Sequence, residues 1–212
     1  MQVEKYTVIT GDIIKSRELK NRPRVQEKLK SVLNRINEKY REYILVNFSI
    51  TAGDEFQGLV SEVGKSYAII KDIEKGIYPL KARFGVGVGR IATPLSNNVG
   101  EMDGECFIRS REALENAKKL NQSIIYNIGI HEKDISLNTI LMLIDAIKKS
   151  WKDVHFKRVW LYEELKTYKK VAKKENISKQ MVSKMFKNIK YDKVKRAEEN
   201  LNFLLNFLKE PT

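Results

Sequence analysis

Three carboxylates lie at or near the ends of predicted β-strands within the first 55 residues of the chain. Asp12 follows a β-branched and aromatic run, and Asp54 and Glu55 lie at the tip of a predicted hairpin with a glycine turn. Mg²⁺ prefers oxygen ligands and usually combines one or two carboxylates with substrate phosphates. A pair of such ions can activate a hydroxyl group and neutralise a leaving pyrophosphate. We interpret the three acids as a magnesium site, and the residue types leave ordinary solvated turn residues open as the alternative.

Cations and glycines would complete a nucleotide site around the bound metal. Arginine and lysine side chains hold phosphate oxygens through charge-assisted hydrogen bonds. The residues predicted to bind the nucleotide are Gly11, Lys15, Arg17, Gly53, Arg109 and Arg111.

Hydrophobic periodicity predicts the elements that must position these residues. Their order is β-α-β-β-α-β with an α-β extension, an α+β pattern typical of the ferredoxin-like or split βαβ fold. We therefore expect an antiparallel sheet with helices on one face. In that topology the first strand lies beside the hairpin, so Asp12 would converge with Asp54 and Glu55. Strands are predicted at about residues 5–10, 44–51, 56–61, 80–91 and 123–128, and helices at about 23–42, 63–76 and 106–120.

A glycine stripe marks one face of the predicted strand at 80–91. Gly85, Gly87 and Gly89 alternate with larger apolar residues, so all three glycines point to the same side of the sheet. Glycines in a strand indicate that something lies close against the backbone. That neighbour is either a packed helix or partner chain, or a nucleotide.

Composition limits the class of protein. The formal net charge is +13, and residues 136–212 hold 18 Lys and Arg against 9 Asp and Glu. This excess favours a polyanionic partner, nucleic acid or nucleotide phosphates. The N-terminus lacks a signal-peptide pattern, and no apolar run approaches the about 18 residues of a membrane span. With a single cysteine, Cys106, we expect a cytoplasmic protein without a membrane segment.

The pattern becomes wholly helical after residue 129, which predicts one domain at 1–132 and a helical domain at 133–212. Within the second, residues 168–186 fit a helix-turn-helix: Ala172 at the helix crossing, Asn176 in a left-handed turn and Ser178 as the next N-cap. An ordinary helical hairpin with a basic face is the alternative. Further helices are predicted at about 135–151, 153–165 and 191–209, and the last could either cover this domain or form a homodimer. The predicted DNA-binding residues are Ser178, Lys179, Gln180, Ser183, Lys184 and Lys187.

The motifs Gly11–Arg17, Ala52–Gly58 and Asp103–Ala113 together resemble the SatD family. More distantly, residues 4–128 resemble the palm-type domain of class III nucleotide cyclases and GGDEF diguanylate cyclases. The resemblance implies two Mg²⁺ ions bound by Asp12, the backbone carbonyl of Ile13, Asp54 and Glu55.

The chain departs from the cyclase pattern at two places. Ala52 replaces the first glycine of the GGDEF signature, and the helix at 106–120 lacks the Asn and Arg that class III cyclases use at the transition state. These departures favour a DNA-binding regulatory protein whose cyclase-like domain binds a nucleoside triphosphate or related nucleotide with Mg²⁺. The alternative is an enzyme, a metal-dependent nucleotidyl cyclase or nucleotidyltransferase, and the sequence leaves that choice open.

Overall fold

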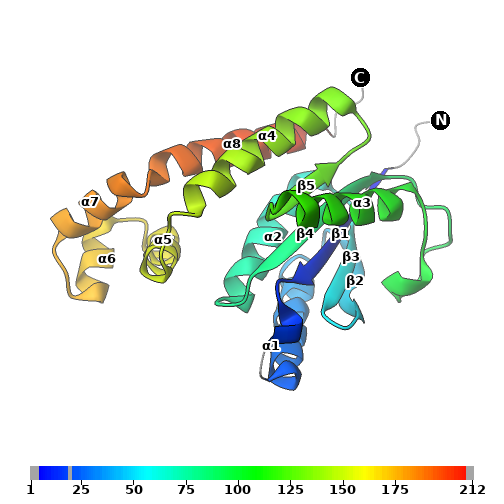
Figure 1. Ribbon diagram of the computed structural model, residues 1–212, viewed down its shortest axis with the longest axis horizontal. Coiled ribbons are helices and arrows are strands. Elements are labelled where there is room, and N and C mark those ends of the chain that lie inside the picture. The colour runs from blue at the N-terminus through cyan, green and yellow to red at the C-terminus, as the bar shows by residue number, and fades with distance from the viewer. Residues whose placement is uncertain (1–4, 19–20, 209–212) are drawn as a thin grey trace. The chain divides into compact units, whose positions relative to one another are not determined.

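The computed structural model describes residues 5–18 and 21–208 (Figure 1). The chain forms two compact units. One comprises the described residues up to Thr139 together with those from Asn202 onward, and the other is Ile140–Leu201. The division falls inside a helix that begins at His131, and the predicted domain boundary at 132/133 lies in the first turn of the same helix.

Each predicted helix and strand is present, with its ends shifted by at most four residues; residue 209, the predicted end of the last helix, lies outside the described residues. In chain order the elements are β1 (Tyr6–Ile13), the 3₁₀ helix η1 (Ser16–Glu18), α1 (Arg22–Lys39), β2 (Ile44–Ala52), β3 (Glu55–Val60), α2 (Val63–Ile77), β4 (Ala82–Gly89), the 3₁₀ helix η2 (Val99–Glu101), α3 (Glu105–Leu120), β5 (Ile124–Asn127), α4 (His131–Lys148), α5 (Asp153–Leu165), α6 (Tyr168–Glu175), α7 (Lys179–Asn188) and α8 (Tyr191–Phe207).

The first unit is built on a mixed five-stranded sheet in the order β2-β3-β1-β4-β5. As expected, β1 lies beside the hairpin strand β3, and both are antiparallel to their neighbours. The expectation of a wholly antiparallel sheet was wrong, because β5 pairs with β4 in parallel. A parallel pair needs a crossover connection, which α3 provides. β1 also runs further than predicted, so Asp12 lies within the strand instead of after it.

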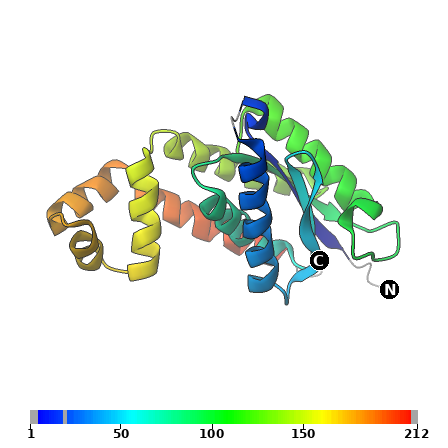
Figure 2. The same ribbon diagram turned by 90° about the horizontal axis from the view of Figure 1, so that it is seen from below.

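Helices cover both faces of this sheet, which corrects the expectation that they lie on one. α1 and α3 lie on opposite sides of the strands (Figure 2). On the α3 side, the Thr10 hydroxyl lies 2.9 Å from the Ser110 hydroxyl. On the other side, the Phe56 and Phe84 rings meet edge to face at 5.9 Å. The sequence pattern did not distinguish the faces because successive strand residues are buried on both.

The glycine stripe of β4 is explained by a packed helix. A Cβ atom on Gly85 would lie 2.2 Å from the carbonyl oxygen of Ser110, and one on Gly87 would lie 2.2 Å from that of Cys106. Side chains other than glycine would therefore collide with the backbone of α3. Of the two alternatives from the sequence, the close neighbour of these two glycines is the helix.

The second unit has a core of its own, rich in aromatic side chains. Phe186 packs against the rings of Tyr162, Tyr168 and Tyr191 at centroid distances of 4.9–5.1 Å. The indole N–H of Trp151 donates to the carbonyl of Ile189, the residue that ends α7, at 2.9 Å. Among the helices in the described part of the chain, none is long and apolar enough to cross a membrane.

Candidate functional site

Two of the three predicted acids meet across neighbouring strands. Asp12 on β1 is the register partner of Glu55 on β3, and both belong to the sheet face covered by α3. The two-residue turn between β2 and β3 holds Gly53, with φ +62°, and Asp54. Gln26 on α1 donates to the carbonyl of Gly53 at 3.0 Å and thereby ties the hairpin tip to the helix.

A lysine that was not predicted lies among these acids. Lys118 Nζ in the last turn of α3 is 3.8 Å from an Asp12 carboxylate oxygen and 2.9 Å from Glu115. Arg111 and Glu115 share this face of the helix, since they precede Lys118 by seven and three residues. Their spacing could have shown a common charged face in the sequence. Only the packing of α3 on the sheet shows that this face meets Asp12.

Burial and crowding change how these groups titrate. Burial raises the pKa of Asp12, Lys118 opposes that rise and Asp54 adds to it, and the net pKa lies above the ordinary value. For Glu55, burial again raises the pKa, Lys118 opposes it and Asp12 adds to it. Burial acts to lower the pKa of Lys118, but Glu115, Asp12 and Glu55 together hold it above its usual range. The acids therefore repel one another, and Lys118 stabilises the charged forms of Asp12 and Glu55.

Among the described residues, one carboxylate oxygen near the hairpin tip is free to accept a ligand. One carboxylate oxygen of Asp54, Oδ2, is buried and accepts no hydrogen bond from the described residues. No three His, Cys, Asp or Glu side chains within residues 5–18 and 21–208 are grouped to hold a metal by themselves. Mg²⁺ commonly takes only one or two protein carboxylates and completes its shell with phosphates and water. The carboxylates near the hairpin tip could therefore supply part of the coordination shell of a magnesium ion.

Three further predicted ligands, Gly11, Ile13 and Lys15, lie at or just after the end of β1. Ile13 ends β1 with its side chain buried, paired with Ala82. Gly11 faces away from the acids, because a Cβ there would lie 2.2 Å from the Phe56 ring on the other side of the sheet. Lys15 is exposed and pairs with Glu18 at 3.1 Å.

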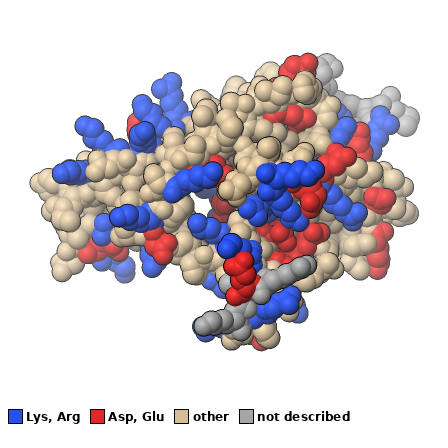
Figure 3. Space-filling view, in the orientation of Figure 1, with Lys and Arg blue, Asp and Glu red and all other residues tan. Residues whose placement is uncertain are grey.

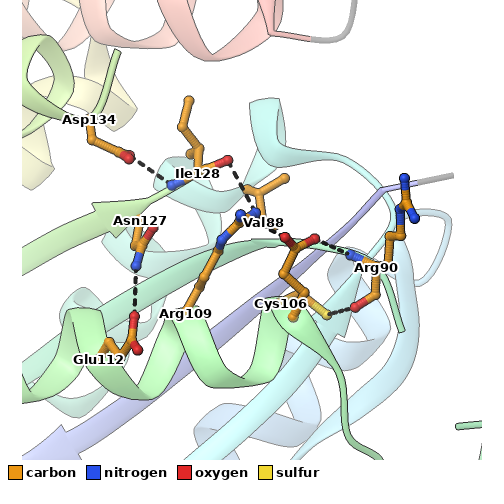
Figure 4. A network of polar contacts seen from close by, with 9 residues as sticks. Val88, Arg90, Cys106, Arg109, Glu112, Asn127, Ile128 and Asp134 are labelled. Carbon is orange, nitrogen blue, oxygen red and sulfur yellow. Dashed lines mark hydrogen bonds and ion pairs between the residues drawn. The ribbon is translucent and has the colours of Figure 1, made fainter. Parts of the chain in front are cut away.

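The two predicted arginines of α3 are separated. Arg111 is close enough to lower the pKa of Glu55. Arg109 contacts the opposite end of the sheet, where it donates to the carbonyl of Val88 at 2.6 Å and pairs with Glu105 at 2.7 Å (Figure 4). The structure therefore does not bring Arg109 to the acids. The side chain of Arg17 lies outside the described residues.

The turn between α6 and α7 has the local geometry expected from the sequence. Asn176 ends α6 in the left-handed conformation at φ 53°, and the Ile177 N–H donates to the carbonyl of Ala172 at 3.0 Å. The Ser178 hydroxyl accepts from the backbone N–H of Met181 at 3.1 Å and so caps α7. Figure 3 shows Lys and Arg side chains over the part of the molecule that α6 and α7 form. All six residues predicted to contact DNA are exposed.

The sequence profile of the SatD family matches residues 6–201. The chain belongs to the SatD family. No curated protein sequence matches this SatD-family chain.

Solved structures similar to this SatD-family protein include several nucleotide cyclases. A bacterial light-regulated adenylyl cyclase is 14% identical with a TM-score of 0.44, over 59% of this chain and 77% of that one. The guanylate cyclase domain of RhGC from Catenaria anguillulae, in complex with GTP, is 15% identical with a TM-score of 0.43, over 53% and 72%. The diguanylate cyclase SiaD from Pseudomonas aeruginosa, in complex with its activator SiaC, is 15% identical with a TM-score of 0.46, over 58% and 50%.

Proposed function

We propose that this SatD-family protein is a DNA-binding regulator that senses a nucleotide. In this proposal α6 and α7 form a helix-turn-helix that binds DNA, and the acids of β1 and the hairpin bind a nucleotide with Mg²⁺. The observation that carries the proposal is the capped, left-handed turn between two short helices, with an exposed cationic face on the second.

The exposed face of α7 has the chemistry that a DNA reader needs. Lys179, Lys184 and Lys187 supply cations for phosphates, and no carboxylate within the described part of the chain lies within 4 Å of their ammonium groups. Gln180 and Ser183 supply polar groups for base edges. The opposite side of the helix is anchored by buried apolar residues, so the cationic face stays outward.

DNA binding is tested by fluorescence anisotropy with a labelled mixed-sequence duplex at several salt concentrations. We expect affinity to fall steeply with salt, and each lysine of α7 that contacts a phosphate to contribute about 1 to the slope. Lys184→Glu should abolish binding. Lys195→Glu is the matched control, because Lys195 already pairs with Glu199 on α8 at 3.7 Å. Equal loss in both variants, or no salt-sensitive binding, would contradict the proposal.

The nucleotide part of the proposal is supported by the acid cluster. Asp12, Asp54 and Glu55 would supply carboxylate oxygens to Mg²⁺, which would neutralise part of the phosphate charge when bound. Lys118 and Arg111 would hold phosphate oxygens from the side of α3. The buried Asp54 oxygen has no hydrogen-bond partner among residues 5–18 and 21–208, and it is the feature that most needs a ligand, because an unpaired buried carboxylate oxygen is costly.

A thermal-shift screen with ATP and GTP tests this site. With Mg²⁺ and ligand at about 100 times Kd, binding should stabilise the protein by about 2.7 kcal/mol. Asp54→Asn and Glu55→Gln should remove the shift, whereas Glu38→Gln, an exposed position on α1, should retain it. A shift that survives both site variants would place the nucleotide elsewhere. Metal-dependent release of pyrophosphate from the nucleotide would favour the enzyme alternative over a sensor.

A further inference from the structure

A second polar site lies at the far end of the sheet from the acid cluster. An open pocket of about 590 Å³ is lined by Lys5, Arg90, Ile91, Ala92, Glu105, Arg109, Ile128 and Gly129. Arg83 on β4 is the register partner of Asp12, and Arg90 follows it by seven residues. Along an extended strand this spacing corresponds to about 23 Å, so the two sites are separate.

The guanidinium of Arg109 is fixed in the wall of this pocket. It donates to the carbonyl of Val88 at 2.6 Å and pairs with Glu105 at 2.7 Å. The other oxygen of Glu105 accepts from the backbone N–H of Arg90 at 3.2 Å (Figure 4). Gly129 leaves the room that this arrangement needs, because a Cβ there would lie 2.2 Å from the guanidinium carbon. A cation held by α3, β4 and the end of β5 is positioned before any ligand arrives.

The lining carries more positive charge than this network uses. Three cations, Lys5, Arg90 and Arg109, line the pocket with one carboxylate, Glu105. Asp134, which accepts from the backbone N–H of the lining residue Ile128 at 2.7 Å, also interacts with Arg109, so these five groups leave one net positive charge. Within the described residues no carboxylate lies within 4 Å of the charged groups of Lys5 or Arg90. The remaining lining is largely apolar, and the volume is in the range of small-molecule sites.

We propose that this pocket binds a small organic phosphate, with the phosphate held by Lys5, Arg90 and the exposed edge of Arg109. A phosphate monoester carries a charge of about −1.5 to −2 at neutral pH, which is opposite in sign to the net charge of these groups. Its organic part lies against Ile91, Ala92 and Ile128. This site is independent of the proposed nucleotide site and of the helix-turn-helix.

The test is a titration of the isotope-labelled full chain with glycerol 3-phosphate, followed by ¹H–¹⁵N NMR. We expect saturable shifts at backbone amides of residues 88–92, 105–109 and 128–130, and none at residues 54–57. The double variant Lys5→Ala with Arg90→Ala should weaken binding about tenfold or more. Ala92→Trp should block the pocket while keeping every cation.

Arg41→Ala is the matched control, since it removes an exposed arginine of the same unit outside the pocket. Unchanged amide positions in α2, residues 63–77, which belongs to the same unit as the substitutions but does not line the pocket, establish that each variant is folded. Absence of saturable shifts would overturn the proposal, as would equal affinity in the double variant or in Ala92→Trp. Binding of glycerol that equals that of glycerol 3-phosphate, or tighter binding of a carboxylate such as succinate, would overturn the assignment to phosphates.

Discussion

Lys118 Nζ lies 3.8 Å from Asp12 Oδ2, which joins the last turn of α3 to the centre of the sheet. The lysine also lowers the pKa of Glu55, so one cation serves carboxylates from two strands. This relationship makes the charge state of the acid cluster depend on a helix that is distant from it in the sequence.

Removing the lysine should shift the titration of both acids. In Lys118→Met we expect the pKa values of Asp12 and Glu55 to rise further, because the cation that lowers them is gone. Carboxyl ¹³C NMR titration measures both values directly. Lys119→Met, at the next and exposed position, should leave them unchanged. Unaltered values in Lys118→Met would mean that the lysine is screened from the acids.

Neutralising Asp12 should stabilise the protein at neutral pH. Its folded-state pKa lies above the ordinary value of 3.8, so its contribution to stability is greatest at low pH and is lost as pH rises through the folded pKa. Asp12→Asn should therefore raise the free energy of unfolding at pH 7 by on the order of 0.5–1 kcal/mol. Urea denaturation should show this gain shrinking as the pH is lowered toward 4. A loss of stability at pH 7 would show that the carboxylate contributes more through Lys118 than it costs.

A single methyl group on the glycine face of β4 should be costly. Gly85→Ala places a carbon against the backbone of α3, which cannot move without the whole helix. Overpacking of this kind typically destabilises by about 1–3 kcal/mol. Gly100→Ala is the control, because its nearest neighbour is an Asn98 side-chain oxygen at 3.4 Å. Chemical denaturation of the two variants should separate them clearly, and equal stability would contradict the close packing.

The turn before α7 should depend on backbone conformation at Asn176. Glycine adopts the left-handed region freely, so Asn176→Gly should be close to neutral. Asn176→Val should destabilise by about 1–2 kcal/mol, because a β-branched residue is strained there. Thermal unfolding followed by circular dichroism would measure the difference. If the valine variant is as stable as the glycine variant, the turn is not held in the left-handed conformation.

The contacts of Arg109 with Val88 and Glu105 should stabilise the fold, whereas the side chain of Arg111 should not. Arg109→Met leaves the carbonyl of Val88 and the carboxylate of Glu105 without their charged donor, which should cost about 1.5–3 kcal/mol. Arg111→Met is the matched control, because it makes the same change of side chain at an exposed position two residues further along α3. We expect it to change the free energy of unfolding by less than about 0.5 kcal/mol in the same assay.

Local sequence patterns predicted the elements well but not how α3 and β5 complete the sheet. The hairpin, the two-residue turn at Gly53 and the cap at Ser178 depend on residues close in the chain, so their signals are local. β5 pairs with β4 in parallel because α3 returns the chain to the end of the sheet at which β4 begins, and the alternation within β5 does not show which strand it joins or in which direction.

The sequence predicted the part of the candidate site that depends on which strands are neighbours, but not the part that α3 contributes. Asp12 and Glu55 meet because β1 and β3 pair in register, which the strand order predicted. The sequence analysis did not include Lys118 and placed Arg109 near the acids. Which residues of α3 lie near the acids depends on the direction in which the helix crosses the sheet, and the sequence pattern did not show that direction. α3 runs from the Arg90 end toward Asp12, so its first turns face one site and its last turn faces the other.

The contact between β4 and α3 also has an evolutionary consequence. Because Gly85 and Gly87 meet backbone atoms of α3, no change of side chain on the helix can compensate for a larger residue at either position. A relative could replace these glycines only if α3 moved away from the sheet, and that movement would carry Lys118 away from Asp12. We therefore expect the two glycines and the lysine to be inherited together or lost together.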